Sequence, residues 1–198
     1  RETLAAAILL QLQWDGSTPL VDPMCGSGTF VIEAAMLARN RPPGRQRSFA
    51  FMHWPRYRPG LWQALLLEAG RQARPLTVAI VGADRDPRAV AAAKRNAERA
   101  GVADDVCLEC VELARLRAPA GCGLMLANPP YGARLEAGSD LAPLYREFGQ
   151  AWLGPFAGWR GALFCPAEAP LAMTGFPLRP LVLWSNGGLP VTLFVTES

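Results

Sequence analysis

The sequence predicts an α/β fold in which helices cover a mostly parallel, seven-stranded sheet that ends in an antiparallel hairpin. A glycine-containing loop at residues 22–29 joins an apolar run to a helical pattern. Within residues 76–82, the continuous apolar run at 78–81 is typical of a strand buried on both faces, as in a parallel sheet. Asn186 and Gly187 stand between two further apolar runs, which is a strong hairpin signal.

The expected elements alternate along the chain. Helices are predicted over 4–12, 30–37, 61–73, 87–99, 141–152 and 167–173, and strands over 19–21, 76–82, 106–111, 124–127, 161–165, 181–184 and 191–195. Pro42 and Pro43 open an insertion, at about 40–75, that postpones the second strand. No repeat or domain boundary is visible, so we expect residues 1–198 to form a single domain.

The loop at 22–29 is expected to hold a ligand. Gly26 and Gly28 permit a sharp turn and a close approach of backbone to ligand, and the helix that follows presents free N–H groups at its start. An acid at a strand end followed by G-x-G is commoner in S-adenosylmethionine enzymes than the longer motif of dinucleotide-binding proteins, whose third glycine is missing here. The alternative is a glycine-rich turn without a ligand.

A second motif, Asn128-Pro129-Pro130-Tyr131, follows the strand predicted at 124–127. The two motifs together resemble the THUMP-associated guanine-N2 methyltransferases that act on large-subunit ribosomal RNA. The resemblance also includes residues 1–7, 82–86, 96–97, 134–135 and 186–187. It implies a class I S-adenosylmethionine-dependent methyltransferase domain with a Rossmann-like fold.

Members of this family usually carry an N-terminal THUMP region that binds RNA, and some carry a second methyltransferase domain. Neither is visible in these residues. We therefore expect a catalytic domain without its recognition region.

The resemblance assigns cofactor-binding residues to the loop and to three later strand ends. They are Asp22, Pro23, Met24, Cys25, Gly26, Ser27, Gly28, Thr29, Asp84, Arg85, Glu112 and Asn128. Asp84 can accept hydrogen bonds from the ribose hydroxyls. The alternative is that Asp84 caps the next helix, a role that we give to Asp86 because Pro87 follows it. Glu112 stands where relatives hold the adenine amino group, usually with the shorter Asp.

The second motif suits methylation of a conjugated amine. Guanine N2 attacks poorly unless its lone pair is drawn out of conjugation, and the Asn128 side-chain oxygen and the Pro129 carbonyl can each accept one of its N–H groups. Pro130 stiffens this geometry, and Tyr131 offers a stacking face for a base that has left its stack. The same motif occurs in methylases of adenine N6 in DNA and of glutamine amides. A transfer RNA guanine-N2 methyltransferase and a catalytically silent RNA-binding module are further alternatives.

Residues 34–67 contain no acid but six arginines, with aromatic residues between them. Arginines and aromatic rings together suit contact with the phosphates and bases of single-stranded or looped RNA. The alternative is that the aromatics pack on the body of the domain while the arginines are only solvated. We assign RNA contacts to Arg41, Arg45, Arg47, Arg56, Arg58 and Arg134.

Composition and cysteine content indicate the class of protein, its compartment and whether a metal is expected. A net charge of +3 and a hydrophobic content of 51% fit a globular domain, and the apolar stretch at 4–12 is too short to span a membrane. Five scattered cysteines favour a reducing cytoplasm over a disulfide framework. Cys107 and Cys110 would face opposite sides of a strand without a histidine nearby, so we expect no metal. The sequence does not indicate an oligomeric state.

Overall fold

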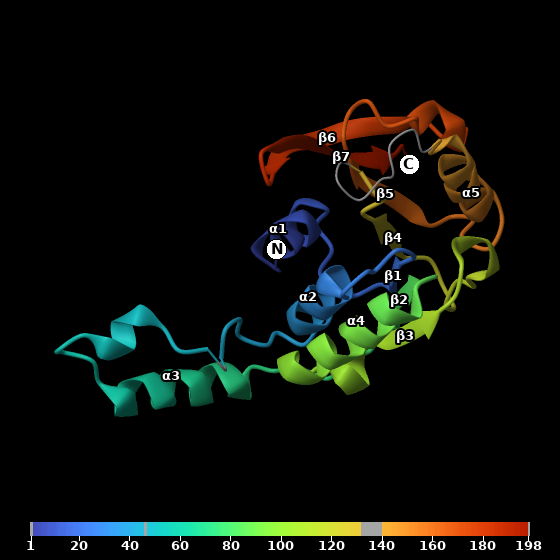
Figure 1. Cartoon of the computed structure of the whole chain (residues 1–198). Coiled ribbons are helices and arrows are strands. Elements are labelled where there is room, and N and C mark those ends of the chain that lie inside the picture. The colour runs from blue at the N-terminus through green and yellow to red at the C-terminus, as the bar shows by residue number, and fades with distance from the viewer. Residues whose placement is uncertain (1, 46, 132–139, 198) are drawn as a thin grey trace.

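A mixed sheet forms the centre of the molecule (Figure 1). Its strands are β1 (Leu20–Asp22), β2 (Ile80–Asp84), β3 (Cys107–Cys110), β4 (Leu124–Ala127), β5 (Arg160–Cys165), β6 (Leu178–Asn186) and β7 (Leu189–Thr196). The computed structural model describes residues 2–45, 47–131 and 140–197, and within them the strand order is β3-β2-β1-β4-β5-β7-β6. Strands β1 to β5 pair in parallel, whereas β7 is antiparallel to both β5 and β6.

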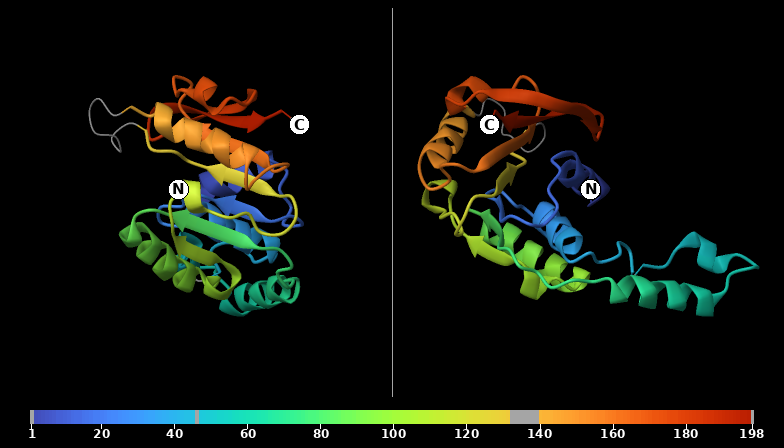
Figure 2. Two further views of the ribbon diagram at one scale, coloured as in Figure 1. Left: turned by 90° about the vertical axis from the view of Figure 1, so that its right-hand side faces the viewer. Right: turned by 180° about the vertical axis from the view of Figure 1, so that it is seen from behind.

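Helices cover both faces of this sheet (Figure 2). One face carries α1 (Glu2–Gln11), α2 (Thr29–Ala38) and α4 (Pro87–Ala100), and the other carries α5 (Ala142–Leu153) with the short 3-10 helices η3 (Leu113–Arg115) and η5 (Leu171–Thr174). The remaining helices are η1 (Ala50–His53), α3 (Pro59–Arg71) and η2 (Ala103–Asp105).

The two cores follow from the alternation of side chains along each strand. In β4, Leu124 and Leu126 pack with α1 and α2, whereas Met125 and Ala127 pack with α5. All four residues are buried. Burial on both faces is expected of an apolar strand at the centre of a parallel sheet.

The order of the strands creates a crevice. From β1 the chain moves outward through β2 to β3, and it then returns to place β4 on the other side of β1. Connections therefore leave β1 and β4 in opposite directions, and the carboxyl ends of these two strands open a space between them. Asp22 ends β1 and Asn128 directly follows β4, so the fold brings both sequence motifs to this space.

The predicted C-terminal hairpin is confirmed. Asn186 pairs with Leu189, which leaves a two-residue turn of Gly187 and Gly188. Both glycines have positive φ values, 63° and 89°, as a type I′ turn requires. The strands extend further than expected, with an irregularity in register near Pro180, which lacks an N–H group for the ladder.

Two predicted boundaries were wrong. Strand β2 begins at Ile80 rather than at residue 76, because its neighbour β1 starts only at Leu20 and offers no earlier partner. The helix predicted over 167–173 is reduced to the single turn of η5, which begins after Pro170. Proline has no N–H group to donate, and this position interrupts the helical ladder.

The insertion forms an arm, which we define as residues 40–75, that projects from the body of the domain (Figures 1 and 2). Its aromatic side chains pack on one another instead of on the sheet. Phe49 and Phe51 stack with ring centroids 5.5 Å apart, and Phe51 meets Trp62 of α3 edge-on at 5.2 Å. No residue of α3 is buried, so the arm has only this small aromatic cluster of its own.

A charged clamp fixes the base of the arm to the body. Arg39 and Asp105 form an ion pair with an Nη1–Oδ1 distance of 2.6 Å, and an Arg41 nitrogen lies 4.0 Å from the second carboxylate oxygen. Arg41 also donates a hydrogen bond to the Gly101 carbonyl oxygen. In the segment that follows α3, the Arg74 Nε donates to the Ala38 carbonyl oxygen at 2.7 Å. Arg41, for which we predicted an RNA contact, therefore has an intramolecular structural role.

The clamp predicts a specific loss of stability. Asp105→Ala should lower the free energy of unfolding by about 1.5–3 kcal/mol, because it leaves Arg39 and Arg41 without their buried carboxylate. The neighbouring Asp104 is exposed, so Asp104→Ala should change the free energy of unfolding by less than about 0.5 kcal/mol. Equal losses for both variants in urea unfolding would contradict a role for the clamp.

Candidate active site

A cleft of about 1170 Å³ lies at the carboxyl ends of β1, β2 and β4. One side is formed by the loop after β1 and the ends of β2 and β3, and the other by residues after β4 and at the start of α5. Of the predicted cofactor-binding residues, all except Gly28 line this cleft. The position agrees with the general location of ligand sites in open α/β sheets.

The loop after β1 is held in an open conformation. The Cys25 N–H donates to the Ala83 carbonyl oxygen at 2.8 Å, which fastens the loop to β2. Gly26 has a φ of 54°, and a Cβ built there would meet no atom within 4 Å, so its backbone faces open space. Gly28 also has a positive φ, 84°, but it packs closely on α4, where a Cβ built on it would lie 3.0 Å from the Cβ of Ala93. Only Gly26 is therefore placed for close contact with a ligand.

The Asp84 carboxylate connects β2 to this loop. Its Oδ2 accepts a hydrogen bond from the Gly26 N–H at 3.0 Å, and its Oδ1 accepts one from the Asp86 N–H at 2.9 Å. Asp86 caps α4, since its carboxylate accepts from the Arg88 N–H at 2.8 Å. The prediction that Asp86, and not Asp84, caps this helix is confirmed.

Asp22 lies beneath the loop and is only 1% exposed. Its Oδ1 accepts from the Met24 N–H at 3.0 Å. Burial raises the pKa of Asp22 from 3.8 to about 8, and the nearby charge of Asp84 adds to the increase. Folding therefore takes up a proton between about pH 4 and pH 8, and the stability that this proton provides is lost as the pH rises through 8.

A further part of the cleft wall comes from the end of β3. Glu112 is exposed and lines the cleft between Val111, which is half-buried, and Leu113, which is buried. Arg85 and Asp86 line the same region from the β2 side. An acceptor between apolar groups is suited to a flat heterocycle that carries an amino group.

The second motif occupies the opposite side. Asn128 and Pro130 line the cleft, and Pro129 is buried. Tyr131 is half-buried and packs against the core that faces α1. Its hydroxyl accepts a hydrogen bond at 2.8 Å from the Asn186 Nδ2, which belongs to the C-terminal hairpin. Asn186 itself lines the cleft, so the hairpin contributes to the site as well as to the sheet.

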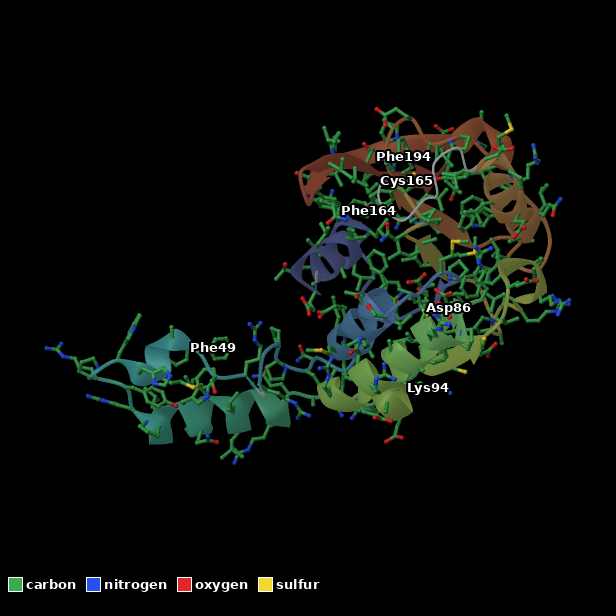
Figure 3. All side chains as sticks on the ribbon, in the orientation of Figure 1. Phe49, Asp86, Lys94, Phe164, Cys165 and Phe194 are labelled. Atoms are coloured by element: carbon green, nitrogen blue, oxygen red, sulfur yellow. The ribbon has the colours of Figure 1, made fainter. Side chains whose placement is uncertain are left out.

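Sequence reasoning missed the apolar end of the cleft. It is lined by Leu4, Ala5 and Ile8 of α1, by Phe30 of α2 and by Phe164 of β5. Figure 3 shows Phe164 on the side of the sheet that faces α1. In the sequence these residues were indistinguishable from ordinary core positions, and Asn186 was recognised only as a turn residue.

The predicted RNA-contacting arginines are in different environments. Arg45, Arg47, Arg56 and Arg58 are exposed on the arm, whereas Arg41 belongs to the clamp. Arg134 lies outside the described residues. Within 2–45, 47–131 and 140–197, no group of three or more His, Cys, Asp or Glu side chains could hold a metal ion. In the same ranges, no helix has the length and apolar character that crossing a membrane requires.

Two solved structures resemble the chain over its whole length. SMU.472, crystallised in complex with S-adenosylhomocysteine, matches with a TM-score of 0.88 and 35% identity over 100% of this chain and 52% of that chain. A protein from Listeria monocytogenes, named as a predicted N6-adenine-specific DNA methylase, matches with a TM-score of 0.84 and 32% identity over 100% and 51% of the two chains. These likenesses confirm the predicted class of fold.

Curated relatives are similar at the level of sequence. A Vibrio campbellii protein is 39% identical over 197 residues, 96% of this chain and 28% of the relative, and a Shewanella protein (strain MR-4) is 42% identical over 171 residues, 83% of this chain and 24% of the relative. Both are named ribosomal RNA large subunit methyltransferase K/L. This chain thus spans about a quarter of their length. The family described as "RMKL-like, methyltransferase domain" matches residues 1–172, and the chain belongs to this family.

Proposed function

We propose that this chain transfers a methyl group from S-adenosylmethionine to the exocyclic N2 of a guanine in large-subunit ribosomal RNA. One observation carries the proposal: the glycine loop with Asp84 and the residues Asn128 and Pro130 open into the same cleft. The choice of RNA is supported by the relatives, whose names specify the large ribosomal RNA.

The cleft fits S-adenosylmethionine in shape and chemistry. The open backbone at Gly26 leaves room for the cofactor, and Asp84 has carboxylate lone pairs to offer to its ribose hydroxyls. Glu112 would accept from the adenine amino group beside Val111 and Leu113. The cofactor supplies an electrophilic methyl group attached to a sulfonium sulfur.

The residues after β4 would activate the amine by orientation. The Asn128 side-chain oxygen and the Pro129 carbonyl accept the two N–H groups of guanine N2, which turns the nitrogen lone pair out of conjugation and toward the methyl group. Fixing the two reacting atoms near contact can supply on the order of 7–11 kcal/mol of the barrier. The apolar end of the cleft, which contains Ile8 and Phe164, would exclude water from the flipped base.

The RNA is proposed to contact the exposed arginines of the arm as well. Arg47, Arg56 and Arg58 can pair with phosphates without disturbing the clamp at the arm's base, whereas Arg45, although exposed, lies beside Gly101 of the clamp. The RNA contact of Arg134 stays a prediction. We place the reaction in the cytoplasm, because five free cysteines suit a reducing compartment.

Adenine N6 in DNA is the second candidate substrate, because the similar Listeria protein carries that name and the amine is also conjugated with a ring. The two functions differ in the product. Mass mapping of methylated nucleotides in ribosomal RNA, transfer RNA and DNA from cells that lack the gene would distinguish them. Loss of N2-methylguanine from ribosomal RNA is the expected result, and loss of N6-methyladenine from DNA would overturn the proposal.

Asp84 should be needed for cofactor affinity. Asp84→Ala should weaken binding of S-adenosylhomocysteine by about 1.5–3 kcal/mol, since hydrogen bonds to a charged group are lost along with the support of Gly26. Isothermal titration calorimetry measures this directly, with the exposed Asp104→Ala as the matched control. Binding of a nicotinamide dinucleotide in place of S-adenosylhomocysteine would refute the assignment.

Asn128 should act on the chemical step. Asn128→Ala should remove most turnover while affinity for S-adenosylhomocysteine changes little, because the lost hydrogen bond is made mainly in the transition state. Asn128→Asp keeps an acceptor oxygen but loses the amide N–H groups, so we expect partial activity. Single-turnover methyl transfer with saturating cofactor separates the two steps. If both variants lost cofactor affinity and turnover in equal measure, Asn128 would be a binding residue.

Tyr131 and Asn186 should behave as a coupled pair. Tyr131→Phe and Asn186→Ala each remove one hydrogen bond and should each cost about 0.5–1.5 kcal/mol in transition-state stabilisation, with little further loss in the double variant. Tyr131→Ala should cost more, because it also removes a stacking face worth about 1–3 kcal/mol. Turnover rates of the four variants provide the test. Additive losses would show that Asn186 acts independently of Tyr131.

A further inference from the structure

We propose that a groove near the tip of the arm binds an unpaired nucleobase of the RNA substrate. The inference rests on the proposed function in taking RNA as the substrate, but it concerns a surface separate from the methyl-transfer cleft. The arm projects away from the sheet (Figures 1 and 2). The groove is lined by residues of η1, of the turn that follows it and of α3.

The groove is an apolar hollow of about 410 Å³. Its apolar lining consists of Phe51, Trp54, Tyr57, Leu61, Trp62 and Leu65. Several of these side chains are unusually exposed for their size: Trp54 is 67% exposed, Leu61 56% and Leu65 55%. Large exposed apolar patches on a projecting element usually mark a binding surface.

The groove exists before any ligand binds. The ring of Phe51 meets Trp62 at 5.2 Å and Tyr57 at 5.9 Å, both edge-on, and it stacks on Phe49 at 5.5 Å. Figure 3 shows Phe49 within the arm, away from the sheet. These contacts hold the rings of the groove's floor in place and leave Trp54 at its edge free to cover a planar group.

The charge of the arm favours an anionic occupant. Residues 40–75 contain seven arginines and one acid, Glu68, for a formal charge of +6, so the rest of the chain carries −3 out of the total of +3. Two of these arginines, Arg56 and Arg58, line the groove itself. An apolar, aromatic surface bordered by guanidinium groups matches a nucleotide, whose base stacks while its phosphate is paired. A second arm would be repelled, which disfavours pairing of two copies through this face.

The base must be unpaired, because a duplex hides the faces of its bases and presents mainly phosphates and groove edges. A loop or bulge in folded RNA supplies such bases. The nucleotide held by the arm would therefore be a different one from the guanine in the cleft, and the arm would help to select an RNA with an exposed base at the right separation.

The test compares single-stranded and duplex RNA of the same sequence. Trp54→Ala in the whole chain should weaken binding of the single strand by about 5- to 150-fold, the range that corresponds to one stacked base, and should leave duplex affinity within about twofold. Trp54→Phe should restore most of the loss because a ring is again present. Leu67→Ala is the matched control, since Leu67 is 65% exposed on α3 but does not line the groove.

Arg56→Ala tests the second half of the site. It should lower the slope of log affinity against log salt by about 0.7 for the single strand, as expected for one lost phosphate contact. Fluorescence anisotropy with end-labelled RNA gives both quantities.

Each contrary outcome has a distinct meaning. If Trp54→Ala weakened binding of single-stranded and duplex RNA equally, or weakened neither, the groove would not be a nucleobase site, while the proposed function would stand. Wild-type protein that binds neither RNA would contradict the proposed function itself, as would methyl transfer that is confined to DNA. Concentration-dependent self-association that Trp54→Ala abolishes would show that the groove is an interface between copies or with protein, and would also overturn the inference.

Discussion

The two hydrogen bonds that Asp84 accepts set the geometry on which the site depends. One comes from the glycine loop after β1 and the other from the turn after β2, so a single carboxylate fixes two neighbouring strand ends. The Asn96 side chain adds a third fixed point, because its Nδ2 donates to the Ser27 carbonyl oxygen at 2.8 Å. The loop is therefore held from β2 and from α4 while its Gly26 backbone stays open to the cleft.

The cleft divides into parts of different chemistry. At the ends of β2 and β3, carboxylates and backbone groups alternate with small apolar surfaces, which suits a nucleoside. Beyond Asn128 the wall becomes apolar, with Ile8 and Phe164 fully buried beneath it. Such a change from polar to apolar surroundings along one cleft suits the proposed function, in which a charged cofactor and a neutral, conjugated base occupy different parts of the cleft. Both parts are built from segments far apart in the sequence, which only the strand order brings together.

Local signals in the sequence were sufficient for the loop and for most elements. Positive φ at Gly26, the cap at Asp86 and the turn at Gly187 all depend on neighbouring residues, and all were predictable. The hydrogen bond from Asn186 to Tyr131 joins residues 55 positions apart, and the Arg39–Asp105 pair joins residues 66 apart. No periodicity or motif encodes such pairings. For the same reason, local charge could not reveal that Arg41 has a partner carboxylate in η2.

Helix α4 connects the cleft to the base of the arm. Its first turn, capped by Asp86, borders the cleft, and its last residues lead to Gly101 and Asp105, which hold the base of the arm. A helix of 14 residues is about 21 Å long, and it has no proline inside its body at which to bend. The separation between the loop after β1 and the root of the arm is therefore set by the number of residues in α4, and inserting or deleting one turn would change this separation by about 5.4 Å.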